Sequence, residues 1–226
     1  MKTGVLGTGM VGRLLAQKLK ESGNEVMIGT RNIEETLAKN GQDSMRNPAF
    51  KEWLGNNPGI QLGTFADTAR FGEIIFVATF GNAATHAIEL AGKENFANKL
   101  VIDVTNPLDF SKGVPPQFTA TVGNSLGEQI QKLLPQSHIV KAFNAVSMHI
   151  VVNPGREDGV PVLFIAGNDK DAKNKVTDLA KSWGWKDVID YGDITESFWL
   201  EALSMIWIRY AFKNNSWTHA FAFLRK

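Results

Sequence analysis

The sequence predicts an α/β protein built around a doubly wound, mostly parallel sheet, with a small helical lobe at its C-terminal end. Short apolar and β-branched runs alternate with amphipathic segments along most of the chain. The run EIIFVATF at 73–80 is almost continuously apolar, which is typical of parallel strands covered on both faces. A glycine-rich turn, GTGMVG at 7–12, directly follows the first predicted strand.

The composition excludes several classes of protein. The 226 residues suffice for one generous domain, or for one domain with a smaller appendage. A formal net charge of +1 provides no basic excess for a nucleic-acid partner, and the absence of cysteine excludes disulfides and thiolate metal sites. The chain shows no signal peptide, and no apolar run approaches the ~20 residues that cross a bilayer. We therefore expect a cytoplasmic protein without a membrane partner.

The first half of the chain is expected to alternate strands with helices. Leu14, Leu15 and Leu19 recur at helical spacing after the glycine turn, and Gly23 ends that helix. The expected strands are residues 3–7, 25–29, 60–65, 73–80 and 100–107. The expected helices are residues 10–22, 33–40 and 82–92, and 47–59 is a polar connection with one helical turn.

The second half begins with a loop rich in proline and glycine at 108–123. Ser125 and Glu128 have the spacing of a capping box, so a helix is expected over 125–135. Strands are expected at 138–146, 160–167 and 186–193, with a helix over 169–185 that Asp169 caps. From Thr195 onward no strand pattern is present, and we expect one or two helices rich in aromatic residues.

The glycine turn fits the G-x-G-x-x-G pattern of dinucleotide-binding Rossmann folds. Among 21 glycines a chance match is easy, but this one joins a strand to a helix. Gly7 permits the tight turn, Gly9 lets the backbone approach a pyrophosphate, and Gly12 allows close packing of helix on sheet. The N–H groups of Gly9, Met10 and Val11 would then face the phosphates at the positive end of the helix. The alternative is a tight connection without a ligand.

The stretch EVMIGTRN at 25–32 indicates which dinucleotide is bound. Arg31 lies 19 residues after Gly12, where NAD-binding proteins place an acidic residue for the ribose hydroxyls. Thr30 and Asn32 can donate hydrogen bonds, and Arg31 offers a planar fork of donors and a face that can stack on adenine. This cluster suits the 2′-phosphate of NADP. The alternative is an exposed arginine at a strand end. Residues 1–150 are thus expected to form an NADP-binding Rossmann domain, and 151–226 to complete the sheet and add the helical lobe.

Several longer motifs resemble a known family. They are GVLGTGMVGRLLAQKLKESGNEVMIGTRN, IIFVATFGNAA, VIDVTNPL, VGNSLGEQIQKLLPQSHIVKAFNAVS and the ending YGDITESFWLEALSMIWIRYAF. Together they resemble the coenzyme F420-dependent NADP oxidoreductase family, whose wider group includes the oxidoreductase domain of the STEAP-type metalloreductases. The resemblance covers essentially the whole chain and implies a Rossmann domain with a small helical lobe, usually in a homodimer.

The resemblance also implies a binding site along the ends of the strands. By position, Gly7, Thr8, Gly9, Met10 and Val11 would hold the pyrophosphate of NADP, and Thr30, Arg31 and Asn32 its 2′-phosphate. The cofactor's ribose would lie by Ala78, Thr79 and Phe80, close to Asn82 and Ala83, and the nicotinamide would be flanked by Asn106, Pro107, Ala142, Phe143 and Asn144. F420 or a flavin would stack on the nicotinamide as the second redox coenzyme.

The expected chemistry needs no catalytic acid or base. Hydride transfer between stacked rings depends on alignment, and no Ser-His-Asp set, metal motif or carboxylate pair is expected at a strand end. His149 either contacts the substrate or is a solvated loop residue, and Asp103 is expected to accept backbone or hydroxyl hydrogen bonds within a buried strand. Trp207 and the other C-terminal aromatics form the core of the lobe, a dimer interface or a wall for a planar coenzyme.

Three interpretations of the activity remain open from the sequence. The first is an NADP-dependent oxidoreductase that exchanges hydride with F420 or a flavin. The second is a metalloreductase-like or quinone-type reductase with a loosely held flavin. The third is a Rossmann protein that senses NADPH without turnover.

Overall fold

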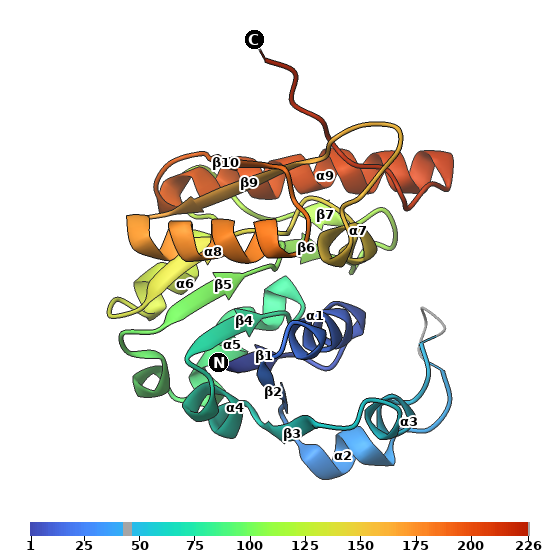
Figure 1. Cartoon of the computed structure of the whole chain (residues 1–226), viewed down its shortest axis with the longest axis vertical. Coiled ribbons are helices and arrows are strands. Elements are labelled where there is room, and N and C mark those ends of the chain that lie inside the picture. The colour runs from blue at the N-terminus through green and yellow to red at the C-terminus, as the bar shows by residue number, and fades with distance from the viewer. Residues whose placement is uncertain (43–46, 226) are drawn as a thin grey trace.

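A computed structural model describes residues 1–42 and 47–225 of the chain (Figure 1). Within these residues eight strands form one sheet in the order β10-β9-β8-β5-β4-β1-β2-β3. In chain order the sheet strands are β1 (Lys2–Leu6), β2 (Glu25–Thr30), β3 (Ile60–Thr64), β4 (Ile74–Val77), β5 (Leu100–Asp103), β8 (His138–Lys141), β9 (Val162–Gly167) and β10 (Asp187–Asp190). A separate hairpin pairs β6 (Leu108–Asp109) with β7 (Gln117–Phe118).

The strand order reverses between β1 and β4. From β1 the chain builds outward through β2 to β3, and then returns to β4 and continues through β5 to β8. Val5 of β1 is therefore paired with Ile28 on one side and with Phe76 on the other. All these pairs are parallel, and only β8–β9 is antiparallel among the described pairs of this sheet. Doubly wound sheets bind ligands beyond the strand C-termini at such a reversal.

Helices cover both faces of the sheet, as the sequence predicts. The helices are α1 (Met10–Glu21), α2 (Ile33–Ala38), α3 (Phe50–Gly55), α4 (Phe65–Phe71), α5 (Gly81–Ala91), α6 (Leu126–Leu133), α7 (Met148–Val152), α8 (Lys170–Ser182) and α9 (Ser197–Asn214), with 3-10 turns η1 (Lys93–Phe96) and η2 (Ile194–Glu196). Alternate strand residues face opposite layers: Val5 and Phe76 join α1, α7 and α8 in one core, whereas Leu6 and Val77 join α4, α5 and α6 in the other.

Several element boundaries differ from the sequence prediction. The predicted strands 73–80, 100–107 and 138–146 end earlier, at Val77, Asp103 and Lys141. Their apolar runs continue beyond the hydrogen-bonded ladder, and the residues past the ladder form the loops at the sheet's carboxyl edge. The sequence also missed α4, α7 and the β6–β7 hairpin. The Thr64–Asp67 capping box that begins α4 is the signal that could have revealed it.

The C-terminal segment is one long helix followed by an extended tail. Helix α9 contacts α6, β9 and η2, and the chain beyond it turns back so that the Val162 N–H donates to the Phe221 carbonyl over 2.9 Å. Lys226 of the predicted segment lies outside the described residues. Strands β9 and β10 extend the same sheet as β1–β5 and β8. No helix among the described residues has the length and apolar character needed to span a membrane.

Candidate functional site

A cleft of about 710 Å³ lies at the carboxyl edge of the sheet, beside β1, β2 and β4. Three loops that the sequence singled out line it together: residues 7–11 after β1, 29–32 at the end of β2 and 78–80 after β4. Ala83 on α5 lines the cleft as well, whereas Asn82 is not among the lining residues. The strand reversal therefore brings three distant segments to one cavity.

The glycine turn forms a cradle with room for an anion. Gly7 has a φ of +123°, and its N–H donates to the Gly29 carbonyl over 3.0 Å. A Cβ on Gly12 would lie 1.9 Å from the Gly7 carbonyl oxygen, so helix and strand approach this closely only with glycine there. A Cβ on Gly9 would meet no atom of the described residues within 4 Å, and Gly9 gives α1 no side-chain cap. The positive end of α1 thus opens into the cleft.

Arg13 holds the glycine turn in place, a role that the sequence did not reveal. Its Nε donates to the Thr8 carbonyl over 2.9 Å and its Nη1 to the Pro48 carbonyl over 2.6 Å. The guanidinium lies over the rings of Phe50 and Trp53, with its carbon 5.2 Å and 5.8 Å from their centroids. A buried arginine so placed ties the phosphate cradle to α3.

The end of β2 carries the predicted specificity cluster. Thr36 donates its hydroxyl hydrogen to the Asn32 carbonyl over 2.7 Å, so the Thr30 hydroxyl, 2.6 Å from Thr36, supplies the hydrogen of that second bond. The Asn32 side chain caps α2 by accepting from the Glu35 N–H over 3.1 Å. Two of the three predicted 2′-phosphate ligands thus already have partners inside the protein.

Arg31 is the exposed member of that cluster. Its Nη2 lies 4.0 Å from Glu35 Oε2, and both side chains are mostly exposed, so the ion pair is weak. Lys39, which lies four residues after Glu35, also lines the cleft. Among the described residues, the cations Arg31 and Lys39 and the carboxylate of Glu35 surround this end of the cleft, so the net charge of these three side chains is positive.

The loop after β4 supplies the opposite end of the cleft. The Thr79 hydroxyl is buried without a hydrogen-bond partner among the described residues, and Phe80 is 76% exposed. A buried hydroxyl without a hydrogen-bond partner costs free energy. A ligand that forms a hydrogen bond with this hydroxyl would therefore be favoured here. A Cβ on Gly81 would lie 1.9 Å from the Asn106 carbonyl oxygen, so α5 begins in contact with the loop after β5.

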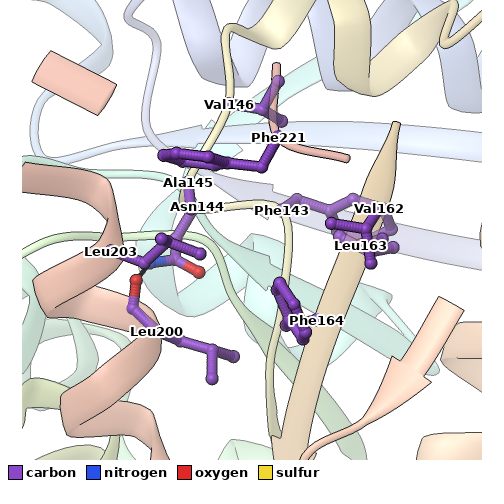
Figure 2. A pocket seen from close by; sticks show the side chains of 10 residues that line it. All are labelled: Phe143, Asn144, Ala145, Val146, Val162, Leu163, Phe164, Leu200, Leu203 and Phe221. Carbon is purple, nitrogen blue, oxygen red and sulfur yellow. Dashed lines mark hydrogen bonds between the residues drawn. The ribbon is translucent and has the colours of Figure 1, made fainter. Parts of the chain in front are cut away.

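The residues predicted to flank the nicotinamide lie beside the cleft rather than in its lining. Asn106 Nδ2 donates to the Asn144 carbonyl over 2.8 Å, and Asn144 Nδ2 donates to Asn106 Oδ1 over 2.9 Å. Ala142 is buried, and the Phe143 ring packs 5.5 Å from that of Trp183. Phe143 and Asn144 border a small cavity of about 10 Å³ that Leu200, Phe164 and Phe221 also line (Figure 2). Pro107, the residue after Asn106, is buried.

The remaining candidates have clear surroundings. Asp103 accepts hydrogen bonds from the N–H and hydroxyl of Thr105, which confirms the predicted role, but it also pairs with Lys141, which the sequence did not reveal. His149 is exposed on α7. The Trp207 ring is buried, stacks on His219 with centroids 4.6 Å apart and donates to its carbonyl, which agrees with a role in the core. Residues 1–42 and 47–225 contain no cluster of side chains that could hold a metal ion.

A doubly wound sheet with a glycine-turn phosphate cradle at its strand reversal defines a Rossmann-type dinucleotide-binding protein. The comparisons specify the family. The family model of F420-dependent NADP oxidoreductases matches residues 2–107. A crystal structure from Arthrobacter sp. FB24, of a provisionally assigned F420-dependent NADP reductase, has 42% sequence identity and a TM-score of 0.93, with 100% of both chains covered. The chain belongs to the coenzyme F420-dependent NADP oxidoreductase family, a family of NADP-dependent oxidoreductases.

Two curated relatives extend this finding. The F420-dependent NADP reductase of Methanocaldococcus jannaschii is 27% identical over 212 residues, which are 92% of this chain and 91% of the relative. The metalloreductase STEAP3 of Rattus norvegicus is 29% identical over 204 residues, which are 90% of this chain. The chain spans only 36% of the length of that metalloreductase.

Proposed function

We propose that this protein catalyses hydride transfer between NADP(H) and a deazaflavin of the F420 type. The observation that carries the proposal is the single cleft into which the glycine cradle, the Arg31 cluster and the loop after β4 all open. The names of the reductases from Methanocaldococcus jannaschii and Arthrobacter support the deazaflavin as second coenzyme.

The residues present fit NADP. The uncapped N-terminus of α1 and the open space at Gly9 suit the pyrophosphate, because backbone N–H groups and the helix dipole favour an anion there. Arg31 and Lys39 suit the 2′-phosphate, and the Thr79 hydroxyl would gain the hydrogen-bond partner that it lacks among the described residues. The nicotinamide supplies the hydride chemistry when the cofactor is bound.

The chain's own contribution is alignment and exclusion of water. Hydride transfer between two planar rings needs them stacked at close range, and positioned groups alone account for a large share of such a rate. The exposed ring of Phe80, whose centroid lies 6.4 Å from that of Phe110, provides an apolar rim at the cleft. The amide pair Asn106–Asn144 would flank the nicotinamide from the side of β5 and β8.

The likeness to STEAP3 favours a second candidate. The match to that metalloreductase covers 90% of this chain, so an NADPH-dependent reductase that uses a loosely held flavin and passes electrons to a ferric chelate or quinone is the alternative. A non-catalytic NADPH sensor would have the cradle but would show no turnover with any acceptor.

One assay separates these functions. NADPH oxidation is measured with F420, FMN, FAD, a quinone and a ferric chelate offered in parallel. We expect the fastest turnover with F420. Turnover only when FAD or FMN is present together with a ferric chelate or quinone would favour the alternative reductase, and tight NADPH binding without any turnover would favour the sensor. Both results would contradict the proposal.

The homodimer and the cytoplasmic location stay predictions. The exposed side of α9 carries Trp199, Ile206 and Tyr210, three large apolar or aromatic side chains on one helix. A helix that is apolar on several sides is usually covered. A second copy of the chain is the occupant that we propose for this surface.

A further inference from the structure

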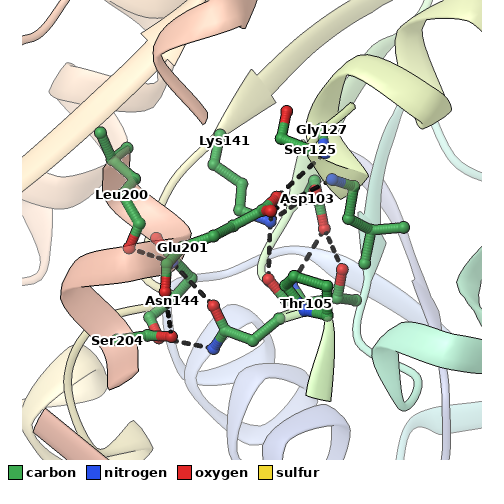
Figure 3. A network of polar contacts seen from close by, with 12 residues as sticks. Asp103, Thr105, Ser125, Gly127, Lys141, Asn144, Leu200, Glu201 and Ser204 are labelled. Carbon is green, nitrogen blue, oxygen red and sulfur yellow. Dashed lines mark hydrogen bonds and ion pairs between the residues drawn. The ribbon is translucent and has the colours of Figure 1, made fainter. Parts of the chain in front are cut away.

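A buried lysine joins three elements beneath the candidate site (Figure 3). Lys141, the last residue of β8, is fully buried. Its Nζ lies 2.8 Å from Asp103 Oδ2, 2.8 Å from Glu201 Oε1 and 2.6 Å from the Thr105 carbonyl oxygen. An ammonium group has three hydrogens to donate, so each has an acceptor. The contacts tie the ends of β5 and β8 to α9.

The two carboxylates are satisfied by further bonds. Asp103 Oδ1 accepts from the N–H of Thr105 over 2.9 Å and from its hydroxyl over 2.6 Å. Glu201 accepts from the N–H groups of Leu126 and Gly127, over 3.1 Å and 3.0 Å, at the positive end of α6. Burial alone would lower the pKa of Lys141, but the carboxylates of Asp103 and Glu201 outweigh burial and raise it, so the lysine is a cation.

The neighbours of these residues hold the amide pair. Asn106 follows Thr105, Asn144 lies three residues after Lys141, and Leu200 precedes Glu201. Asn144 Nδ2 donates to both Asn106 Oδ1 and the Leu200 carbonyl, each over 2.9 Å. The pair Leu200–Glu201 on α9 therefore holds Asn144 directly and Asn106 through it.

The same loop reaches the cleft itself. The Asn106 carbonyl oxygen packs against Gly81 so closely that a Cβ on Gly81 would lie only 1.9 Å from it. Gly81 directly follows Thr79 and Phe80, which line the cleft. A shift of the loop after β5 would consequently displace the β4–α5 turn. The buried ionic network is thus connected by direct contacts to the proposed nicotinamide end of the cleft.

Stability alone does not account for such a network. Burying two carboxylates and an ammonium group is costly, and apolar residues of similar volume often serve equally well or better. We propose that Lys141 and Glu201 are positioning residues: they fix the loops after β5 and β8, and through Asn106 and Asn144 the nicotinamide half of the site. This inference rests on the proposed function and assigns the adenine half to other residues.

The test uses the two halves of the cofactor as separate probes. The full chain carries the double substitution Lys141→Met with Glu201→Gln, which removes the cation and one carboxylate together. Affinities for 2′,5′-ADP and for reduced nicotinamide mononucleotide are measured by calorimetry, and NADPH-dependent turnover is measured alongside. We expect unchanged affinity for 2′,5′-ADP, at least tenfold weaker binding of the nicotinamide half, and a kcat at least tenfold lower.

Two further variants keep the test decisive. Glu201→Gln alone leaves Lys141 paired with Asp103, so it retains the fold and gives the same pattern with a smaller loss. Lys99→Met is the matched control. Lys99 directly precedes β5 and so lies at the opposite edge of the sheet, where its Nζ donates to the Ala69 carbonyl over 2.7 Å. We expect Lys99→Met to leave both affinities and kcat unchanged.

The results that overturn the inference are distinct. Equal affinity of the wild type and the folded double variant for the nicotinamide half, with equal kcat, would contradict the positioning role while leaving the proposed function standing. An equal loss for both halves would show a general structural role and contradict it too. Failure of the wild type to bind either half would contradict the proposed function, and the positioning role with it.

Discussion

At the residue scale, Gly9 and Gly12 of the glycine turn have different structural roles. A methyl group on Gly12 would lie 1.9 Å from the Gly7 carbonyl oxygen, whereas one on Gly9 would meet no atom of the described residues within 4 Å. We expect Gly12→Ala to lower the free energy of unfolding by about 1–3 kcal/mol through overpacking. Gly9→Ala should leave stability unchanged and weaken NADPH binding about tenfold or more, which corresponds to about 1.4 kcal/mol or more. Thermal unfolding and calorimetric titration check both variants, and equal effects would contradict the cradle.

A second pair of residues isolates the Thr79 hydroxyl. Among the described residues, the hydroxyls of Thr79 and Thr68 are both buried without a hydrogen-bond partner, but only Thr79 lines the cleft. Replacing either with valine removes an unsatisfied polar group, so neither Thr79→Val nor Thr68→Val should destabilise the fold. Only Thr79→Val should weaken NADPH binding, by about three- to tenfold, as expected for one neutral hydrogen bond of about 1 kcal/mol. Equal NADPH affinities of the two variants would contradict a contact at Thr79.

At the scale of the element, α4 begins with a reciprocal cap whose strength depends on pH. Thr64 Oγ1 donates to Asp67 Oδ2 over 2.6 Å and accepts from the Asp67 N–H over 3.1 Å. The hydrogen bonds from the Thr64 hydroxyl and backbone lower the pKa of Asp67 below its ordinary value of 3.8. A carboxyl group whose pKa is lowered on folding stabilises the fold at pH values above its ordinary pKa. That stabilisation is lost as the pH falls through the lowered pKa.

Thr64→Ala should therefore cost about 1 kcal/mol of the free energy of unfolding near neutral pH. Part of that difference from the wild type should be lost as the pH falls below 3.8 and through the lowered pKa of Asp67, where the carboxylate of the folded protein becomes protonated. Urea unfolding of both proteins at a series of pH values measures it. A difference that does not change with pH would show that the charged cap contributes nothing.

The elements also show what a sequence pattern can predict. The capping residues Ser125 and Asp169 begin their helices as expected, because a cap depends on residues three positions apart. The glycine turn was predictable for the same local reason. The end of β4 at Val77 was not, because an apolar run does not show where the neighbouring strand stops pairing. Nor was the contact between Lys141 and Glu201, because 60 residues separate them and their meeting depends on the whole fold.

At the scale of the whole molecule, the exposed side of α9 predicts self-association. Ile206 is 61% exposed between Trp199 and Tyr210 on that helix. We expect the wild type to be a homodimer by light scattering, and Ile206→Glu to shift it to monomer, because a buried unpaired carboxylate is costly. Val122→Glu, a like change at an exposed loop valine, is the control and should leave the dimer intact. A wild type that is monomeric at every concentration tested would contradict the proposed surface.

The central claim is that the cleft selects NADP through its 2′-phosphate, and Arg31 tests it most directly. Arg31→Ala should lower the ratio of NADPH to NADH affinity by about ten- to hundredfold, because a charge-assisted hydrogen bond contributes about 1.5–3 kcal/mol. Arg70→Ala is the control: this arginine is exposed on α4, pairs with Asp67 and should leave the ratio unchanged. Calorimetric titration of both nucleotides measures the ratio. An unchanged ratio in Arg31→Ala would contradict the assignment.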